Sequence, residues 1–315
     1  MTTYLITGGA GFIGSNIVHH LVQNNESVVV LDNLSTGNLS NLEPVLKKIR
    51  FIEGDIRDLS TLQQAFKGVD YVLHQAALRA VGRSIDDPVE TNGNNITGTL
   101  NVLVAARDNQ VKRIVYASSS SVYGTIKEEY NVETLVPSPE SPYALTKLTG
   151  EHYCRIFSHL YGLETVTLRY FNVFGPHQDP ESKYSAVIPI FIDNLLRNKA
   201  PEIHWDGNQS RDFTFVGNVV QANIKAATTK NLKPGEAYNI GNGENTSINQ
   251  LLTMLQELLG VSLMPKRSEK RAGDIYRTHA SIDKAKRDLG YEPAVSFYEG
   301  LKSSIAWYQS HLRKS

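Results

Sequence analysis

The sequence contains very little cysteine, with Cys154 as its single example among 315 residues. One cysteine cannot form a disulfide within the chain, so we expect a fold without a disulfide framework, which suits a reducing compartment. The ordinary role of such a residue is a buried structural thiol.

The sequence also lacks a long hydrophobic run and an excess of either charge. No stretch approaches the ~18 apolar residues of a membrane helix, and "MTTYLITGGAG" has neither the basic nor the apolar segment of a signal peptide. Lysine plus arginine equals aspartate plus glutamate at 32 each, which gives no electrostatic reason to expect nucleic acid or an anionic membrane as a partner. We therefore expect a cytoplasmic protein that binds neither.

The first part of the chain alternates short apolar runs with helical patterns. The runs are "TYLITGG", "SVVVLDN", "IRFIEGD", "YVLHQAA", "KRIVYASS" and "ETVTLRYFN". Between the first two, "SNIVHHLVQNN" places Ile17, Leu21 and Val22 on one helical face. Uninterrupted apolar strands between helices indicate a parallel sheet covered on both faces. We therefore predict the α/β class, with a Rossmann-type doubly wound parallel sheet up to about residue 170.

The second part of the chain has a looser pattern. After the polar loop "FGPHQDPESKYS", the segment "SINQLLTMLQELLG" predicts a helix capped by Ser247 and ended by Gly260. In the same way, the segment "SIDKAKRDLGYEP" predicts a second helix, capped by Ser281 and ended by Gly290.

These patterns predict two units. The first is a nucleotide-binding domain over residues 1–171, to which a later segment at about 212–242 returns. The second is a smaller α/β lobe over residues 172–315, which would bind the substrate.

Three glycines in "TGGAGFIG" mark a candidate dinucleotide site. Gly8, Gly11 and Gly14 follow a strand and open a helix, where Phe12 and Ile13 lie. Glycines let the backbone turn tightly and approach a pyrophosphate, and the helix N-terminus offers free N–H groups. A plain strand-to-helix turn is the alternative, but the strand before and the helix after favour the dinucleotide.

Two aspartates follow the next two strands. Asp32 ends "VVVLD", where a carboxylate accepts hydrogen bonds from both ribose hydroxyls and repels a 2′-phosphate. No arginine stands beside it, so the sequence predicts NAD rather than NADP as the cofactor. Asp55 ends the following strand, where it could meet the adenine edge. The alternative for both residues is capping of a helix or turn.

A tyrosine and a lysine in "SPYALTK" form a candidate catalytic pair. Tyr143 and Lys147 are four residues apart, on one face of a helix. A phenol has a pKa of about 10, and lowering it to about 7 requires roughly 4 kcal/mol. A nearby ammonium and the pyridinium of oxidised nicotinamide could supply this, so that the phenolate takes a hydroxyl proton while hydride leaves. A surface pair is the alternative.

At this point the sequence resembles a known family, the extended short-chain dehydrogenase/reductases, and within it the UDP-hexose 4-epimerases. The resemblance rests on "TGGAGFIG", "YASSSSVYG", "SPYALTK", "LRYFNVFGP", "SRDFTFV" and "RAGD". It implies that Ser119 is the hydroxyl partner, Tyr143 the base and Lys147 the cation that also holds the nicotinamide ribose. The other residues implied to bind NAD are Asn33, Ser35, Thr36, Gly37, Ile56, Gln75, Ala76, Ala77, Arg79, Asn94 and Tyr170.

The resemblance also gives meaning to the four serines of "SSSSVYG". Relatives that dehydrate nucleotide sugars carry an acidic pair at Ser120 and Ser121, and relatives that decarboxylate UDP-glucuronate carry a glutamate at Ser121. Elimination needs an acid and a base, and serine is poor at both. The serines therefore favour oxidation at the 4-position followed by hydride return, with NAD kept bound. Ser118 and Ser120 are expected to be filler, whereas Ser121 is expected to touch substrate.

The same resemblance places a nucleotide anchor in the second lobe. It implies that Asn172, Arg211 and Arg271 hold the diphosphate, because guanidinium groups grip phosphate oxygens bidentately. It also implies that Asp274 takes the uridine ribose and that backbone near Val187 meets the uracil.

The sugar pocket is expected to depend on Thr278. In the family, the residue four places after the ribose-binding aspartate lines the sugar 2-position, and relatives with a small residue there admit an acetamido group. Thr278 is small, which predicts UDP-N-acetylglucosamine as well as UDP-glucose as a substrate. Arg79 and Ala80 after "HQAAL" instead match relatives that act on plain sugars.

The resemblance further implies a homodimer, paired through the helix after Pro88 and the Tyr143 helix into a four-helix bundle. No metal site is expected. Two alternatives stay open: a dehydratase or decarboxylase of the same family, and a non-catalytic dinucleotide sensor. A sensor could dispense with Ser119, Tyr143 and Lys147, so their joint presence favours an enzyme.

Overall fold

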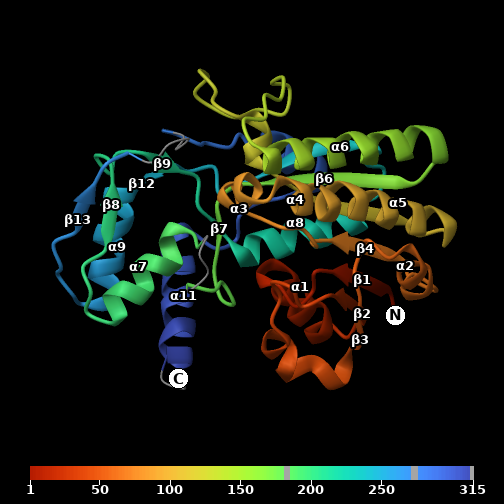
Figure 1. The fold of residues 1–315 in the computed structure, drawn as a ribbon, viewed down its shortest axis with the longest axis horizontal. Coiled ribbons are helices and arrows are strands. Elements are labelled where there is room, and N and C mark those ends of the chain that lie inside the picture. The colour runs from red at the N-terminus through yellow and green to blue at the C-terminus, as the bar shows by residue number, and fades with distance from the viewer. Residues whose placement is uncertain (181–184, 271–275, 313–315) are drawn as a thin grey trace.

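The centre of the computed structural model, which describes residues 1–180, 185–270 and 276–312, is a seven-stranded sheet (Figure 1). Its strands are β1 (Thr3–Thr7), β2 (Ser27–Asp32), β3 (Arg50–Glu53), β4 (Tyr71–His74), β5 (Arg113–Ser119), β6 (Glu164–Tyr170) and β11 (Glu236–Ile240). They lie in the order β11-β6-β5-β4-β1-β2-β3, and every neighbouring pair is parallel. The predicted α/β class and doubly wound sheet are therefore confirmed.

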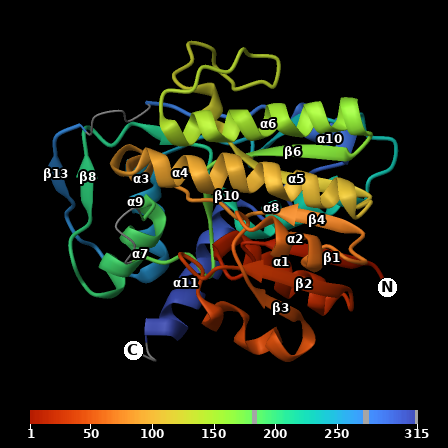
Figure 2. The ribbon, with the colours of Figure 1, turned by 45° about the vertical axis from the view of Figure 1, so that its right-hand side comes forward.

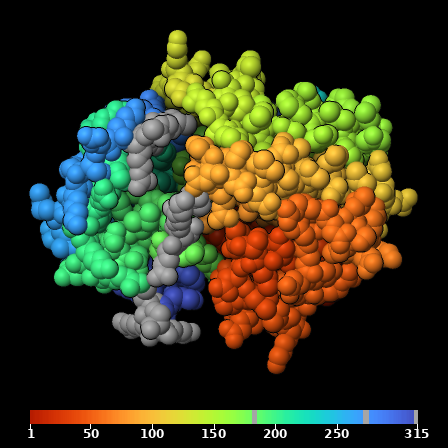
Figure 3. Space-filling view, in the orientation of Figure 1, coloured from red at the N-terminus to blue at the C-terminus, as the bar shows by residue number. Residues whose placement is uncertain are grey.

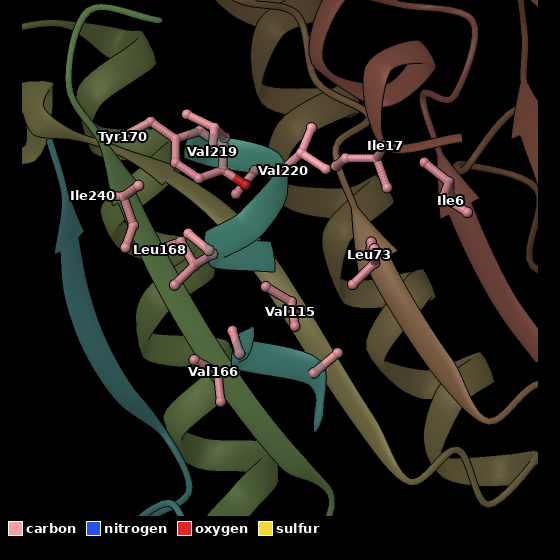
Figure 4. Packing of buried hydrophobic residues seen from close by; sticks show 14 of the residues in the cluster. Ile6, Ile17, Leu73, Val115, Val166, Leu168, Tyr170, Val219, Val220 and Ile240 are labelled. Carbon is pink, nitrogen blue, oxygen red and sulfur yellow. The ribbon is translucent and has the colours of Figure 1, made fainter. Parts of the chain in front are cut away.

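Helices cover both faces of this sheet. One face carries α1 (Phe12–Gln23), α8 (Val216–Thr228) and α10 (Asp283–Leu289), and the other carries α2 (Leu59–Ala65), α5 (Gly98–Asp108) and α6 (Pro142–Tyr161). Figure 4 shows Val219 and Val220 of α8 and Ile17 of α1 packed over the strands. Burial of each such side chain contributes about 1.5–3 kcal/mol. The predicted apolar face of α1, with Ile17, Leu21 and Val22, is buried as expected.

Shorter helical segments complete the first part of the chain. They are a 3₁₀ segment (Leu39–Lys48), α3 (Val81–Asp86), α4 (Pro88–Asn92), a π-helical turn (Gly93–Thr97) that joins α4 to α5, and a 3₁₀ turn (Ser120–Tyr123) after β5. No helix within the described residues combines the length and the hydropathy needed to cross a bilayer.

A smaller lobe lies beside the carboxyl ends of the strands (Figures 1 and 2). Its helices are α7 (Val187–Leu196), α9 (Ile248–Leu259) and α11 (Phe297–Leu312). Its strands form short pairs: β7 (Val173–Phe174) with β10 (Thr214–Phe215), β9 (Ser210–Arg211) with β12 (Thr246–Ser247), and β8 (Glu202–His204) with β13 (Lys266–Ser268). The buried side chains of these helices form a core of their own.

Two predicted helix starts have different outcomes. Ser247 caps α9 in a reciprocal pair with Gln250, and Gly260 ends that helix in the left-handed conformation, as predicted. The predicted cap at Ser281 is wrong, because its hydroxyl donates to the Asp283 carboxylate (3.1 Å) and α10 begins without a side-chain cap. The left-handed glycine at the end of α10, Gly290, is confirmed.

Candidate active site

A cavity of about 1400 Å³ lies between the two lobes, at the carboxyl ends of the strands. The strand order reverses between β1 and β4, and such a switch point is where ligands bind in open α/β sheets. In the space-filling view, the red to yellow-green first lobe and the green and blue second lobe lie side by side (Figure 3).

Almost all predicted site residues that the structure describes line this one cavity. On the cofactor side they are Gly8, Gly11, Phe12, Ile13, Gly14, Asp32, Asn33, Ser35, Thr36, Gly37, Ile56, Gln75, Ala76, Ala77, Arg79, Asn94, Tyr143, Lys147 and Tyr170. On the substrate side they are Ser119, Ser121, Asn172, Val187, Arg211 and Thr278. Two predicted residues, Arg271 and Asp274, lie outside the described residues.

The glycine turn between β1 and α1 leaves no room for side chains. A Cβ on Gly14 would lie 2.2 Å from the carbonyl oxygen of Gly8, and one on Gly8 would lie 2.7 Å from the backbone of Ala76. Gly8 also has a φ of +68°, which favours glycine. No side chain caps α1, and its first turn contains no acidic residue. This turn therefore fits a pyrophosphate, which would accept from the N–H groups at the start of α1.

The Asp32 carboxylate organises the loop beside this turn. It accepts hydrogen bonds from the backbone N–H of Ala10 (2.9 Å) and of Leu34 (2.8 Å). Asp32 therefore does cap a turn, which is the alternative role that the sequence allows. A Cβ on Gly37 would lie 2.9 Å from each carboxylate oxygen. Burial raises the pKa of Asp32, and the two backbone hydrogen bonds oppose that shift. Because Asp32 also lines the cavity, capping does not exclude contact with a ribose.

Asp55 is the predicted cofactor residue that does not line the cavity. Arg57 binds both of its carboxylate oxygens, at 2.9 and 2.7 Å, and Asn33 donates to it at 3.0 Å. Its pKa falls to about 2, chiefly because of the hydrogen bond from Arg57. An approach of Asp55 to adenine stays a prediction.

The candidate catalytic groups come from the end of β5 and the start of α6. Ser119 closes β5, and its Oγ accepts from the N–H (3.2 Å) and the hydroxyl (2.9 Å) of Ser121. Tyr143 and Lys147 lie on α6, one turn apart, as the spacing predicts. Lys147 Nζ donates to the carbonyl oxygen of Ala117 at 2.7 Å, which fixes it below the strand end.

Burial dominates the acidity of this pair. It raises the pKa of Tyr143, while a hydrogen bond with Ser119 and the nearby Arg79 cation lower it. Burial lowers the pKa of Lys147 to about 8, so that its ammonium remains largely charged near neutrality. The sequence indicates Arg79 as a cofactor ligand and as a match to relatives that act on plain sugars, but no sequence signal indicates its electrostatic effect on Tyr143.

Two predicted cofactor residues are held by a partner that no motif indicated. Asn223 of α8 donates to the Tyr170 hydroxyl at 2.8 Å and accepts from Gln75 at 3.0 Å. Burial raises the pKa of Tyr170 to about 12, so this phenol stays neutral. The network fixes the cavity wall formed by Gln75 and Tyr170.

Asn94 reaches the cavity from the π-helical turn between α4 and α5. Its side chain donates to the backbone oxygen and to the carboxylate of Glu90, each at 2.9 Å. Single π-helical turns occur often at functional sites because they redirect side chains.

The substrate side of the cavity joins segments that are far apart in the chain. Asn172 has a φ of +27°, and its side-chain nitrogen donates to the Thr278 hydroxyl at 3.0 Å. Arg211 lines the same wall, where its guanidinium donates to the backbone oxygen of Ser210 at 2.9 Å. Val187 begins α7 at the edge of the cavity. A predicted phosphate ligand and the predicted sugar gate are therefore in direct contact.

Comparison with known proteins agrees with this geometry. Residues 4–241 match the NAD dependent epimerase/dehydratase family. The chain belongs to this family. A putative UDP-glucose 4-epimerase of Methanocaldococcus jannaschii is 42% identical over 98% of this chain and 99% of that protein.

Solved structures of family members are also similar along their whole length. A UDP-N-acetylglucosamine 4-epimerase from Methanobrevibacter ruminantium, in complex with UDP-N-acetylmuramic acid, is 37% identical with a TM-score of 0.94, covering 98% of this chain and 99% of that one. A UDP-glucose 4-epimerase from Thermotoga maritima, with UDP-glucose, is 36% identical with a TM-score of 0.93, covering 99% and 100%.

The family also establishes the cofactor. The family is NAD dependent, and a UDP-glucose 4-epimerase of Thermus thermophilus, 36% identical with a TM-score of 0.89 over 98% of this chain and 99% of that one, was solved as a complex with NAD. The protein is an epimerase-family enzyme that uses NAD, as the sequence predicted.

Proposed function

We propose that the protein inverts the 4-hydroxyl of UDP-hexoses, by transient oxidation to the 4-keto sugar and return of hydride to the opposite face. The proposal rests on one observation. Ser119 and Tyr143 are hydrogen-bonded to each other, and they line the same cavity as the glycine turn at the start of α1. Similar proteins named UDP-glucose and UDP-N-acetylglucosamine 4-epimerases support the same reaction.

In this proposal each side chain has one task. Tyr143 takes the proton of the 4-hydroxyl and gives it back after inversion, with Ser119 holding that hydroxyl in place. Lys147 favours the phenolate through its charge and binds the nicotinamide ribose. When bound, NAD would supply a positive charge beside the phenol and the reversible acceptor for the hydride of the sugar. The N–H groups of the α1 turn hold the pyrophosphate of the cofactor, and Asp32 holds its adenosine ribose.

The composition of the strand end favours epimerisation over elimination. A dTDP-glucose 4,6-dehydratase from Streptomyces venezuelae has a TM-score of 0.91 and 34% identity to this chain, so the fold alone does not decide between the reactions. Ser119, Ser120 and Ser121 all line the cavity, and this strand end carries no carboxylate. Without an acid at this strand end to protonate a leaving hydroxyl, we expect the 4-keto sugar to have one productive exit, which is reduction.

The nucleotide is held so that the sugar can turn. Asn172 and Arg211 reach the cavity from the second lobe and would bind the diphosphate, together with Arg271 and with Asp274 on the uridine ribose. We propose UDP-glucose and UDP-galactose, and also the N-acetylated pair, as substrates, because Thr278 leaves space beside the sugar. Similar proteins that are named UDP-glucuronate 4-epimerases make the charged sugar the competing choice.

Product analysis without added cofactor tests this function. Purified protein is incubated with UDP-glucose and, separately, with UDP-N-acetylglucosamine, and the products are separated by chromatography. We expect the corresponding 4-epimers at equilibrium. A 4-keto-6-deoxy sugar would instead show a dehydratase, and unchanged substrates would favour a dinucleotide sensor.

Asp32→Ala should weaken NAD retention and relax discrimination against NADP, because the carboxylate that repels a 2′-phosphate is removed. The NAD content of the purified variant and its affinity for NADP are the measurements. Asp58→Ala is the control, since Asp58 also accepts from a backbone N–H, that of Ser60, but does not line the cavity. Full NAD occupancy with continued exclusion of NADP in Asp32→Ala would contradict this role.

We also propose that the protein is a homodimer, paired through α4, α5 and α6 into a four-helix bundle. These helices lie side by side on one surface of the molecule (Figure 2). Of these helices, α4 exposes Val89 (80%) and α6 exposes Leu160 (71%), and the partner helices of a bundle would cover these apolar side chains. Light scattering should give twice the 35.0 kDa of one chain, and Val89→Glu with Leu160→Glu should give the monomer.

A further inference from the structure

A buried ion pair lies directly behind the catalytic strand end. Glu151 of α6 and Arg169 of β6 are 8% and 5% exposed, and the guanidinium binds both carboxylate oxygens, at 2.7 and 3.0 Å. The Ser118 hydroxyl donates to the same carboxylate at 2.5 Å. Ser118 is therefore not filler, and the pair is part of the wall beneath the site.

The pair belongs to a series of contacts between α6 and β5. Tyr143, Lys147 and Glu151 recur at intervals of four, so they lie along one face of α6. Lys147 donates to the backbone oxygen of Ala117, and Glu151 accepts from the next residue, Ser118. These successive contacts end one residue before Ser119, so they set the position of that hydroxyl relative to Tyr143.

The charge of Lys147 depends on the groups that face it. Besides the Tyr143 phenol, the described groups that interact with the Lys147 charge are Cys154 and Glu151 on α6, His74 on β4 and the Tyr116 ring on β5, 5.1 Å from Nζ. Burial raises the pKa of Cys154 and of Tyr116 and lowers the pKa of His74 to about 3, so all three are neutral at pH 7. Glu151, which forms the buried ion pair with Arg169, is the negatively charged group among them.

We propose that Glu151 is a positioning residue of the reaction: its carboxylate holds the end of β5 against α6 and keeps the Lys147 side chain charged. The proposal rests on the 4-epimerase function and deepens it. Lys147 can favour the Tyr143 phenolate only while it carries a proton, so activity is lost as pH rises through the pKa of Lys147. Removal of the Glu151 charge lowers that pKa, and the alkaline loss of activity then begins at lower pH.

The test uses Glu151→Gln, which keeps the shape of the side chain and removes its charge. The protein is purified with NAD bound and labelled with ¹³C-lysine, and the Lys147 signal is assigned by its loss in Lys147→Arg. We expect the Lys147 titration to move to lower pH by at least about half a unit. The alkaline limb of kcat should move with it, while KM for UDP-glucose stays within about twofold.

Two further variants keep the test decisive. Glu164→Gln is the matched control. Glu164 forms an ion pair with Arg113 at the start of β5 and β6, whereas the catalytic residues lie where these strands end. This variant should therefore leave the Lys147 titration unchanged. Glu151→Gln alone leaves the Arg169 guanidinium buried without its partner, which could prevent folding. The double variant Glu151→Gln with Arg169→Met removes that charge and replaces the single variant in the test if the single variant does not fold. The double variant also removes the Arg169 cation, which partly offsets the loss of the Glu151 charge, so we expect a shift of the Lys147 titration in the same direction but smaller than in the single variant.

An unchanged Lys147 titration in a folded Glu151 variant would overturn the proposal. A loss of activity that is equal at every pH would do the same, because it would show a purely structural role. The NMR titration needs no turnover, so a failure of the 4-epimerase function would be recognised separately by wild-type protein that leaves UDP-glucose unchanged.

Discussion

Tyr143→Phe should lower the rate of epimerisation by at least ~10², which corresponds to ~2.7 kcal/mol or more of lost transition-state stabilisation. The substitution removes the hydroxyl that takes and returns the proton but keeps the ring, which lines the cavity beside Ser119. Fold and NAD binding should therefore survive. The measurement is kcat and KM with UDP-glucose, together with the NAD content of the purified variant.

Tyr153→Phe provides the control for this experiment. Tyr153 lies on the same helix, α6, where it packs against the core and does not line the cavity. The same loss of one phenolic hydroxyl should there leave the rate within about twofold. If Tyr143→Phe kept its activity within threefold of wild type, the role of Tyr143 as the base would be wrong.

Thr278→Tyr should nearly abolish turnover of UDP-N-acetylglucosamine, by at least ~10², and leave UDP-glucose within about tenfold. An acetamido group is several heavy atoms larger than a hydroxyl, and a tyrosine ring would fill the space that it needs. Packed sites do not absorb such an overlap cheaply. The measurement is kcat/KM for both sugars, with the wild type active on both.

The structure requires a second variant beside this one, because Thr278 accepts a hydrogen bond from Asn172, a proposed phosphate ligand. Thr278→Val keeps the size and removes the acceptor, so it isolates the effect of that hydrogen bond. We expect Thr278→Val to affect both sugars alike and by less than about tenfold. An equal loss on both sugars in Thr278→Tyr would show that Thr278 is not the gate, and wild-type inactivity on UDP-N-acetylglucosamine would refute the wider substrate range.

The fold of the first lobe follows from signals that are local in the sequence. The apolar runs of β1 to β6 and the face of α1 with Ile17 and Leu21 obey simple periods. In the second lobe, the cap and end of α9 also use the expected residues. The second lobe was harder to predict because strands of two or three residues, such as β9 and β12, carry no period of their own. Their pairing is decided by tertiary packing instead.

The lining of the cavity can be predicted where a motif fixes both residue and place, as for Gly14, Ser119 and Tyr143, which all line it. A residue is missed where only packing decides, as for Asn223, whose hydrogen bonds fix the cavity wall from a helix without a motif. Glu151 could have been found from the sequence, because it continues the spacing of Tyr143 and Lys147 on one helical face.

The acidity of Tyr143 shows what sequence reasoning leaves out. From the sequence, a lysine and a cationic cofactor are expected to lower its pKa. In the structure, burial raises that pKa, and Ser119 and Arg79 oppose the effect of burial. The extent of burial depends on both lobes together and cannot be read from the spacing of two residues.

The fate of the hydrogen on C4 of the sugar tests the central claim most directly. UDP-[4-²H]glucose is incubated with the purified protein in ordinary water without added cofactor, and the product is examined by mass spectrometry and NMR. We predict UDP-galactose that retains deuterium at C4, because the hydride removed from the sugar is returned to the same carbon. Loss of the deuterium to solvent, or the absence of UDP-galactose, would contradict oxidation and return as the reaction of this protein.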